Sequence, residues 1–189
     1  MSTSRLPLRF VRHGATVANL AGLRCGGDLD LPLTDEGRHQ AAAAARRIAR
    51  LDPPIGVIVT SDLRRTRESA AIIAEALPGR RILIEPGFAE RRLGGWNLRP
   101  IDETQPWLEA RQTPPGGEAD DEFIDRIDRA MRRIEGELAN APLLVSSKGV
   151  ARALGELMKL PVRLEIANGA IAEFDLAAQT CYTTEWSAL

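Results

Sequence analysis

Short runs of apolar, β-branched residues alternate with longer helical segments along most of this chain, and this alternation restricts the possible fold most strongly. The apolar runs predict strands at 6–11, 53–61, 80–86 and 142–147. Helical spacing and end signals predict helices at 34–50, 61–77, 119–139 and 149–160. Alternating strands and helices form mainly parallel sheets with helices on both faces. The sequence therefore predicts an α/β fold, a three-layer α/β/α sandwich with a mainly parallel sheet.

The C-terminal part of the chain departs from this alternation. Asn168-Gly169 lies between two apolar runs, a typical hairpin signal, and predicts a turn with a final strand behind it. We therefore expect antiparallel strands to close the sheet at its C-terminal end. Segment 87–117, rich in glycine and proline, predicts a long covering loop with short helical pieces. A chain of 189 residues has the usual length of one compact domain, so residues 1–189 are predicted to form a single domain.

The composition excludes several classes of function. The 25 basic residues are balanced by 26 acidic ones, which argues against nucleic-acid or membrane partners and makes any anion preference local. The two cysteines, Cys25 and Cys181, are far apart, and only His13 and His39 accompany them, so we expect no structural zinc site. The N-terminus lacks a signal peptide's apolar run, and no stretch reaches the ~18–20 apolar residues of a membrane span. We therefore expect a cytoplasmic protein.

Ligands of parallel α/β sheets bind at the carboxyl ends of the strands, so polar residues at those ends are the candidates for a site. The four predicted strands lead, in order, to Arg12-His13-Gly14, to Ser61 with Arg64-Arg65, to the loop containing Glu90, and to Ser147. Arginines, a histidine and a glutamate at one edge of a sheet make an anion site that also has a nucleophile and an acid.

Phosphoryl transfer needs this combination of side chains. Guanidinium groups hold the three equatorial oxygens of its transition state, while a nucleophile attacks in line and an acid protonates the leaving oxygen. A neutral imidazole nitrogen is a suitable nucleophile and gives a phosphohistidine that water hydrolyses. No metal or other cofactor is required.

Five segments also carry a family resemblance that extends over most of the chain. They read FVRHGATVAN, DLPLTDEGRHQA, VTSDLRRTRESA, FAERRLGGW and PPGGEADDEFIDR. In this order they resemble the histidine phosphatase superfamily, which includes cofactor-dependent phosphoglycerate mutases and many small phosphomonoesterases. The combination is far more specific than any one segment.

The resemblance implies a role for each candidate. It implies that His13 is the phosphorylated nucleophile and that Arg12 and Arg65 hold the phosphate. It also implies that Glu90 is the proton donor and that Asn19 lies at the rim of the pocket. Arg65 is preferred to Arg64 because it occupies the fourth position after Ser61 in the pattern SxLxR. The alternative is that Glu90 is an ordinary surface carboxylate, and Glu85 is a second glutamate nearby.

The last predicted strand departs from the family pattern. The family usually reads SHGGVxR there, and this chain reads SSKGVAR, so Ser147 stands where a second histidine is expected. Loss of a charge-assisted donor forfeits ~1.5–3 kcal/mol, and loss of one transition-state donor costs on the order of 10²–10³ in rate. Lys148 has two interpretations. It swings in as a point charge on the phosphate, or it points away because neighbouring strand residues face opposite ways.

The resemblance implies a phosphomonoesterase that acts on a small phosphorylated substrate through a phosphohistidine at His13, weakened or specialised by Ser147. The alternative is an inactive pseudophosphatase that binds phosphate or a partner. A phosphoglycerate mutase is the third interpretation, which the shortness of the chain disfavours. Ala15 after RHG, and WNLRP in place of the usual WEG, alter the expected substrate contacts. The sequence does not give the oligomeric state.

Overall fold

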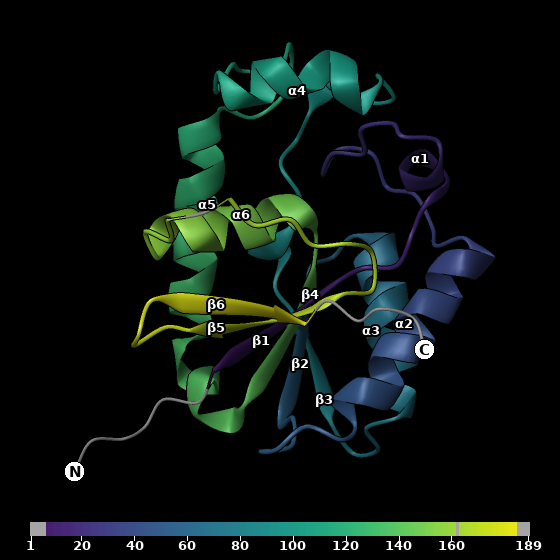
Figure 1. Ribbon diagram of the computed structural model, residues 1–189, viewed down its shortest axis with the longest axis vertical. Coiled ribbons are helices and arrows are strands. Elements are labelled where there is room, and N and C mark those ends of the chain that lie inside the picture. Colours follow the sequence, from purple (N-terminus) through teal and green to yellow (C-terminus); the bar gives the residue numbers. More distant parts are fainter. Residues whose placement is uncertain (1–6, 162, 185–189) are drawn as a thin grey trace.

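The computed structural model describes residues 7–161 and 163–184, and within them a six-stranded sheet forms the middle of the molecule (Figure 1). The strands are β1 (Leu8–Arg12), β2 (Val57–Thr60), β3 (Arg81–Ile84), β4 (Pro142–Ser146), β5 (Ile171–Asp175) and β6 (Thr180–Thr184). Their order across the sheet is β3-β2-β4-β1-β5-β6. Neighbours among β1 to β4 pair in parallel, and β5 and β6 are antiparallel. The predicted α/β fold with antiparallel C-terminal strands is confirmed.

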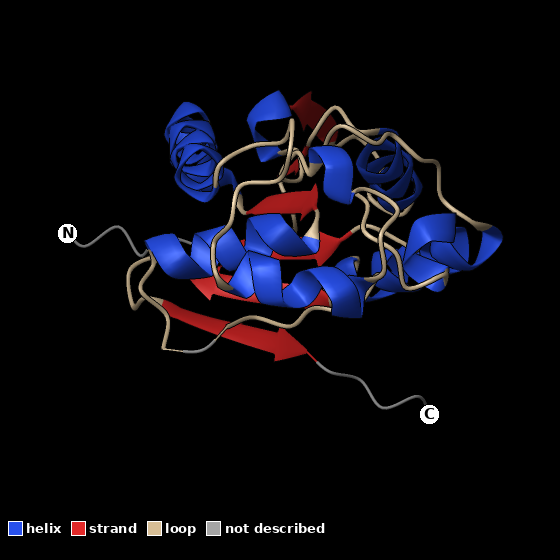
Figure 2. Ribbon diagram, turned by 90° about the horizontal axis from the view of Figure 1, so that it is seen from above, coloured by secondary structure: helices blue, strands red, loops and turns tan. Residues whose placement is uncertain are grey.

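Helices cover both faces of the sheet (Figure 2). The α-helices are α1 (Val17–Leu20), α2 (Asp35–Ile48), α3 (Arg64–Glu75), α4 (Ile101–Glu109), α5 (Asp120–Arg133) and α6 (Lys148–Leu157). Short 3-10 helices are η1 (Pro86–Phe88), η2 (Gly94–Trp96) and η3 (Glu135–Asn140). Helices α2 and α3 pack on one face, and α5 and α6 on the other. None of the helices in the described ranges has the length and apolar character needed to cross a membrane.

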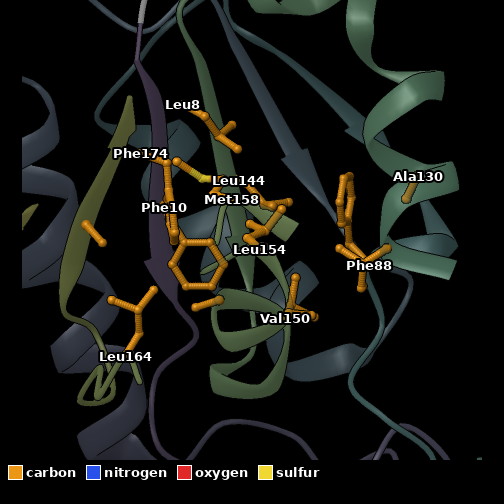
Figure 3. Packing of buried hydrophobic residues seen from close by; sticks show 14 of the residues in the cluster. Leu8, Phe10, Phe88, Ala130, Leu144, Val150, Leu154, Met158, Leu164 and Phe174 are labelled. Atoms are coloured by element: carbon orange, nitrogen blue, oxygen red, sulfur yellow. The ribbon is translucent and has the colours of Figure 1, made fainter. Parts of the chain in front are cut away.

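The larger part of the core lies between the sheet and the pair α5 and α6 (Figure 3). Phe10 of β1 and Phe174 of β5 meet edge to face, with ring centroids 6.0 Å apart. Val150 and Leu154 of α6 are buried against the same cluster. Every residue of β4 is buried, because strands flank it on both sides and helices cover both its faces. This packing fixes where β4 ends and α6 begins.

The register of the parallel strands brings their ends together. Arg12 of β1 lies beside Ser146 of β4, and Thr60 of β2 lies beside Val145. The residue that follows each of these strands therefore enters the same edge of the sheet. His13, which follows β1, and Ser147, which follows β4, therefore lie at this edge of the sheet.

The predicted hairpin at Asn168-Gly169 is wrong in its location. The structure has a turn there, with Gly169 at φ 73°, but the turn leads into β5, and the β5–β6 hairpin is closed by residues 176–179. Residues before Gly169 are a loop because the Ile166 carbonyl accepts from Arg12 and the Asn168 side chain donates to the His13 carbonyl. The first residue of the predicted strand 6–11 lies outside the described ranges. The final five residues of the C-terminal tail lie outside them too.

Candidate active site

A cavity of about 530 Å³ opens where β1 and β4 end. Of the predicted site residues, those lining it are Arg12, His13, Asn19, Glu90 and Lys148. Arg65 and Ser147 are 0% and 1% exposed and each adjoins a lining residue, Arg65 through a bond to the Cys25 carbonyl and Ser147 as the neighbour of Lys148 in the chain. The structure therefore brings all seven predicted residues to one region, five of them on the cavity surface.

His13 is buried and held by its backbone and its ring. Its N–H donates to the Ser146 carbonyl at 2.8 Å, and Nδ1 lies 2.8 Å from the Gly14 carbonyl oxygen. Because a carbonyl only accepts, Nδ1 carries the proton and Nε2 keeps its lone pair. Burial lowers the pKa of His13 well below 6.5, with the charges of Arg65 and Arg12 acting in the same direction. The ring is thus a neutral imidazole suited to nucleophilic attack.

Two arginines flank this imidazole without using all their donors. Arg12 donates from Nη1 to the Ile166 carbonyl at 2.9 Å. Arg65 donates from Nη1 to the Leu29 carbonyl at 2.9 Å and from Nη2 to the Gly26 carbonyl at 3.2 Å. Burial lowers the pKa of Arg12 to about 10, opposed by the carboxylate of Glu90. The two guanidinium groups are thereby held in place, while the buried Nε–H of each has no hydrogen-bond partner.

The unused donors are concentrated at this site. Among the described residues, four buried side-chain polar atoms have no hydrogen-bond partner, and three of them are Arg12 Nε, Arg65 Nε and Ser147 Oγ. Buried polar atoms are nearly always paired, so a group of unpaired donors calls for a partner. An oxyanion supplies several acceptors at once and bonds strongly to guanidinium.

Glu90 follows η1, and its carboxylate is held by two backbone N–H groups. Oε1 accepts from Arg91 N at 2.7 Å, and Oε2 accepts from Gly149 N at 3.0 Å. The alternative carboxylate, Glu85, instead pairs with Arg133 and caps η1, away from the cavity lining. Of the two glutamates, only Glu90 reaches the same cavity as His13.

Ser147 and Lys148 begin α6. Ser147 is the N-cap residue, yet its hydroxyl caps no backbone N–H. Lys148 lines the cavity, with Nζ 3.3 Å from Glu165 Oε2 at the exposed rim. Burial, followed by the charges of Arg152, Arg12 and Arg24, lowers the pKa of Lys148 to about 8. Lys148 is the first residue of α6, so strand alternation does not set its direction, and both interpretations of its role stay predictions.

Several further residues at or beside the cavity were not among the candidates named from the sequence. Arg24 comes from an irregular segment, and its Nε donates to Thr104 Oγ1 of α4 at 2.7 Å. Arg152 adds another cation on the α6 side. Asn168 donates to the His13 carbonyl at 2.9 Å and to Asn19 Oδ1 at 3.3 Å, which joins the β5 turn to the site. Their contacts depend on segments far apart in the chain.

The arrangement contains the groups that phosphoryl transfer needs. It combines a neutral imidazole, two fixed guanidinium groups and a carboxyl group around one cavity. No three His, Cys, Asp or Glu side chains of the described ranges meet as metal ligands would. The chain's own groups are those that an in-line transfer to nitrogen uses.

Comparison with known proteins agrees with this chemistry. The model of the histidine phosphatase superfamily (branch 1) matches residues 8–188. A probable phosphoglycerate mutase GpmB of Photorhabdus laumondii is 34% identical over 198 residues, covering 96% of this chain and 90% of the relative. One from Serratia proteamaculans is 32% identical with the same coverage.

Solved structures share the fold over nearly the whole chain. A mycobacterial glucosyl-3-phosphoglycerate phosphatase complexed with VO3 has a TM-score of 0.74 and 28% identity, covering 98% of this chain and all of that one. A protein described as mycobacterial hydrolase 1 has a TM-score of 0.76 and 25% identity, covering 97% and 98% of the two chains.

Proposed function

The chain belongs to branch 1 of the histidine phosphatase superfamily, and from this membership we propose that it is a phosphomonoesterase acting through a phosphohistidine at His13. The observation that carries the proposal is the set of unpaired donors beside the imidazole, Arg12 Nε, Arg65 Nε and Ser147 Oγ. Such donors suit the oxygens of a phosphoryl group. We propose that the substrate is a small phosphomonoester. We also propose that residues 1–189 form a single domain.

In this mechanism His13 Nε2 attacks phosphorus in line, and the bond between phosphorus and the leaving oxygen breaks. The carboxyl group of Glu90 gives its proton to that oxygen. Arg12 and Arg65 hold the equatorial oxygens. Water then attacks the phosphohistidine, its proton passes to the Glu90 carboxylate, and inorganic phosphate leaves with neutral His13 restored.

Ser147 sets the strength of this catalysis. We infer that it replaces a second histidine, so the phosphoryl group loses a charge-assisted donor and gains at most one ordinary hydroxyl bond. Lys148 lines the same cavity, and its ammonium lies 3.3 Å from Glu165 Oε2. We propose that this lysine supplies part of the lost charge.

The test is release of phosphate from an aryl phosphate. We expect His13→Ala to abolish the activity, whereas His39→Ala, at an exposed position of α2, leaves it unchanged. Equal release by wild type and His13→Ala would show that the nucleophile is assigned wrongly.

Two alternatives remain as proposals. A pseudophosphatase is favoured by the neutral Ser147 and by the ion pair that holds Lys148 on Glu165. It predicts saturable binding of vanadate with no His13-dependent hydrolysis. A mutase is suggested by the names of the curated relatives, and since 90% of the first of them is covered, chain length does not argue against it. Interconversion of phosphoglycerate isomers tests that activity.

A further inference from the structure

Arg126 of α5 donates hydrogen bonds to the backbone of the loop that contains Glu90. Arg126 donates from Nη1 to the carbonyls of Gly87 and Ala89, at 2.8 and 2.9 Å. It donates from Nη2 to the carbonyl of Glu90 itself, at 3.3 Å. One guanidinium group thus holds three carbonyls in the four residues that end at the proposed acid.

The same guanidinium is fixed by a buried carboxylate. Arg126 Nε lies 2.8 Å from Glu118 Oε1, and Nη2 lies 2.7 Å from Oε2. Glu118 is 2% exposed, and its Oε2 also accepts from Arg92 N at 3.2 Å. The backbone is therefore held on both sides of Glu90, by Arg126 before it and by Glu118 after it.

Neither residue lines the cavity, so neither would touch a substrate. Both belong to segment 114–126, which carries part of the family resemblance but has no role in the proposed chemistry. A planar guanidinium group offers more N–H donors than an ammonium group, in a fixed geometry, and can therefore bond a carboxylate and three carbonyls together. The geometry calls for a rigid support rather than for charge alone.

We propose that Arg126 and Glu118 are positioning residues that hold the carboxyl group of Glu90 at the leaving oxygen of the substrate. This inference rests on the proposed role of Glu90 as the acid. A small displacement of a catalytic group is costly because proton transfer requires hydrogen-bond distance. Loss of Arg126 or Glu118 should therefore impair protonation of the leaving group and leave phosphate binding unchanged.

The experiment compares kcat/KM for two aryl phosphates of similar size, phenyl phosphate and para-nitrophenyl phosphate. The nitrophenolate leaves readily without a proton, whereas the phenolate needs one. We expect Arg126→Met to lower kcat/KM for phenyl phosphate on the order of 10²-fold and to affect the nitrophenyl ester much less. Glu90→Gln should show the same asymmetry, and vanadate affinity should stay at the wild-type value in both variants.

Matched variants separate positioning from general damage. Arg132 lies on the same helix α5, its side chain is 76% exposed and it pairs with Asp128, so Arg132→Met should leave both rates unchanged. Arg126→Lys keeps the charge without the fork and should restore only part of the loss. If Arg126→Met does not fold, Glu118→Gln tests the same support, with a smaller loss in the same direction.

The outcomes distinguish this inference from the proposed function. Equal slowing of both esters by Arg126→Met and Glu118→Gln, with Glu90→Gln still discriminating between them, would overturn the positioning role alone. Full activity of His13→Ala, or no discrimination by Glu90→Gln, would overturn the proposed mechanism itself.

Discussion

The backbone N–H of Gly149 donates to Oε2 of Glu90 at 3.0 Å. This hydrogen bond joins the loop that contains Glu90 to the first turn of α6. This N–H belongs to a helix N-terminus, where backbone donors have no partner within the helix and can hold a carboxyl oxygen in place. Helix α6 thus begins beside the proposed acid and also carries Ser147 and Lys148 at its start.

This contact predicts the effect of a single methyl group. A Cβ at position 149 would stand 2.8 Å from the carboxyl carbon of Glu90, so Gly149→Ala must displace that side chain. We expect kcat/KM for phenyl phosphate to fall by about 10²-fold, with vanadate binding retained. Gly136→Ala in η3 is the control, because a Cβ there meets nothing within 4 Å. An unchanged rate in Gly149→Ala would show that the placement of Glu90 does not limit catalysis.

Adjacent arginines of α3 should behave differently. Arg65 is fully buried with an unpaired Nε, whereas the side chain of Arg64 is 60% exposed and pairs with Glu68. A hydrogen bond to a charged group contributes about 1.5–3 kcal/mol, so Arg65→Met should weaken vanadate binding by roughly 10- to 10²-fold. Arg64→Met should bind as wild type does. Equal affinities in a titration of the two variants would remove Arg65 from the phosphate site.

Ser147→His tests the missing donor. The hydroxyl of Ser147 has no partner, and an imidazolium there would add a charge-assisted bond to the transferring phosphoryl group. We expect the rate of phosphate release to rise by about 10²-fold, and the gain should vanish in the double variant with His13→Ala. A rate no higher than that of an active wild type would indicate that Ser147 or Lys148 already serves in a working site.

Lys148 predicts a pH dependence of phosphate binding. Burial and the neighbouring arginines lower its pKa to about 8 from 10.5, so the ammonium loses its proton as pH rises through about 8. Only the charged form attracts phosphate, and calorimetry should therefore show affinity falling between about pH 7 and pH 9. Lys148→Met should bind more weakly at neutral pH and lack this fall. The same slope in wild type and variant would assign the titration to another group.

The shift of Lys148 has a matching effect on stability. Between about pH 8 and 10.5 the unfolded chain binds this proton and the folded chain does not, so stability rises with pH across that window. Below about pH 8 both states are charged, and the folded state bears the full cost of burying the ammonium. We expect bound phosphate to offset that cost by pairing with the ammonium.

The sequence alone determined the architecture and the candidate residues. Alternating strands and helices predicted the α/β fold, because each element must bury one apolar face and the period of its apolar residues shows which element it is. The polar residues at strand ends identified Arg12 and His13, since Arg12 is the last residue of β1 and His13 follows it. The roles of these residues, and the replacement of a histidine by Ser147, stay predictions.

Only the tertiary structure decided how the side chains combine. The choice between Glu85 and Glu90 depended on which loop carboxylate meets α6, a contact between segments 59 residues apart. Lys148 lines the cavity as the first residue of α6, so strand alternation does not set its direction. The hydrogen bonds from Arg126 to the carbonyls of the loop that contains Glu90 join residues 36 to 39 positions apart in the chain. Local patterns fix which face an element buries, but pairs of distant side chains depend on sheet register and helix packing, which no local pattern contains.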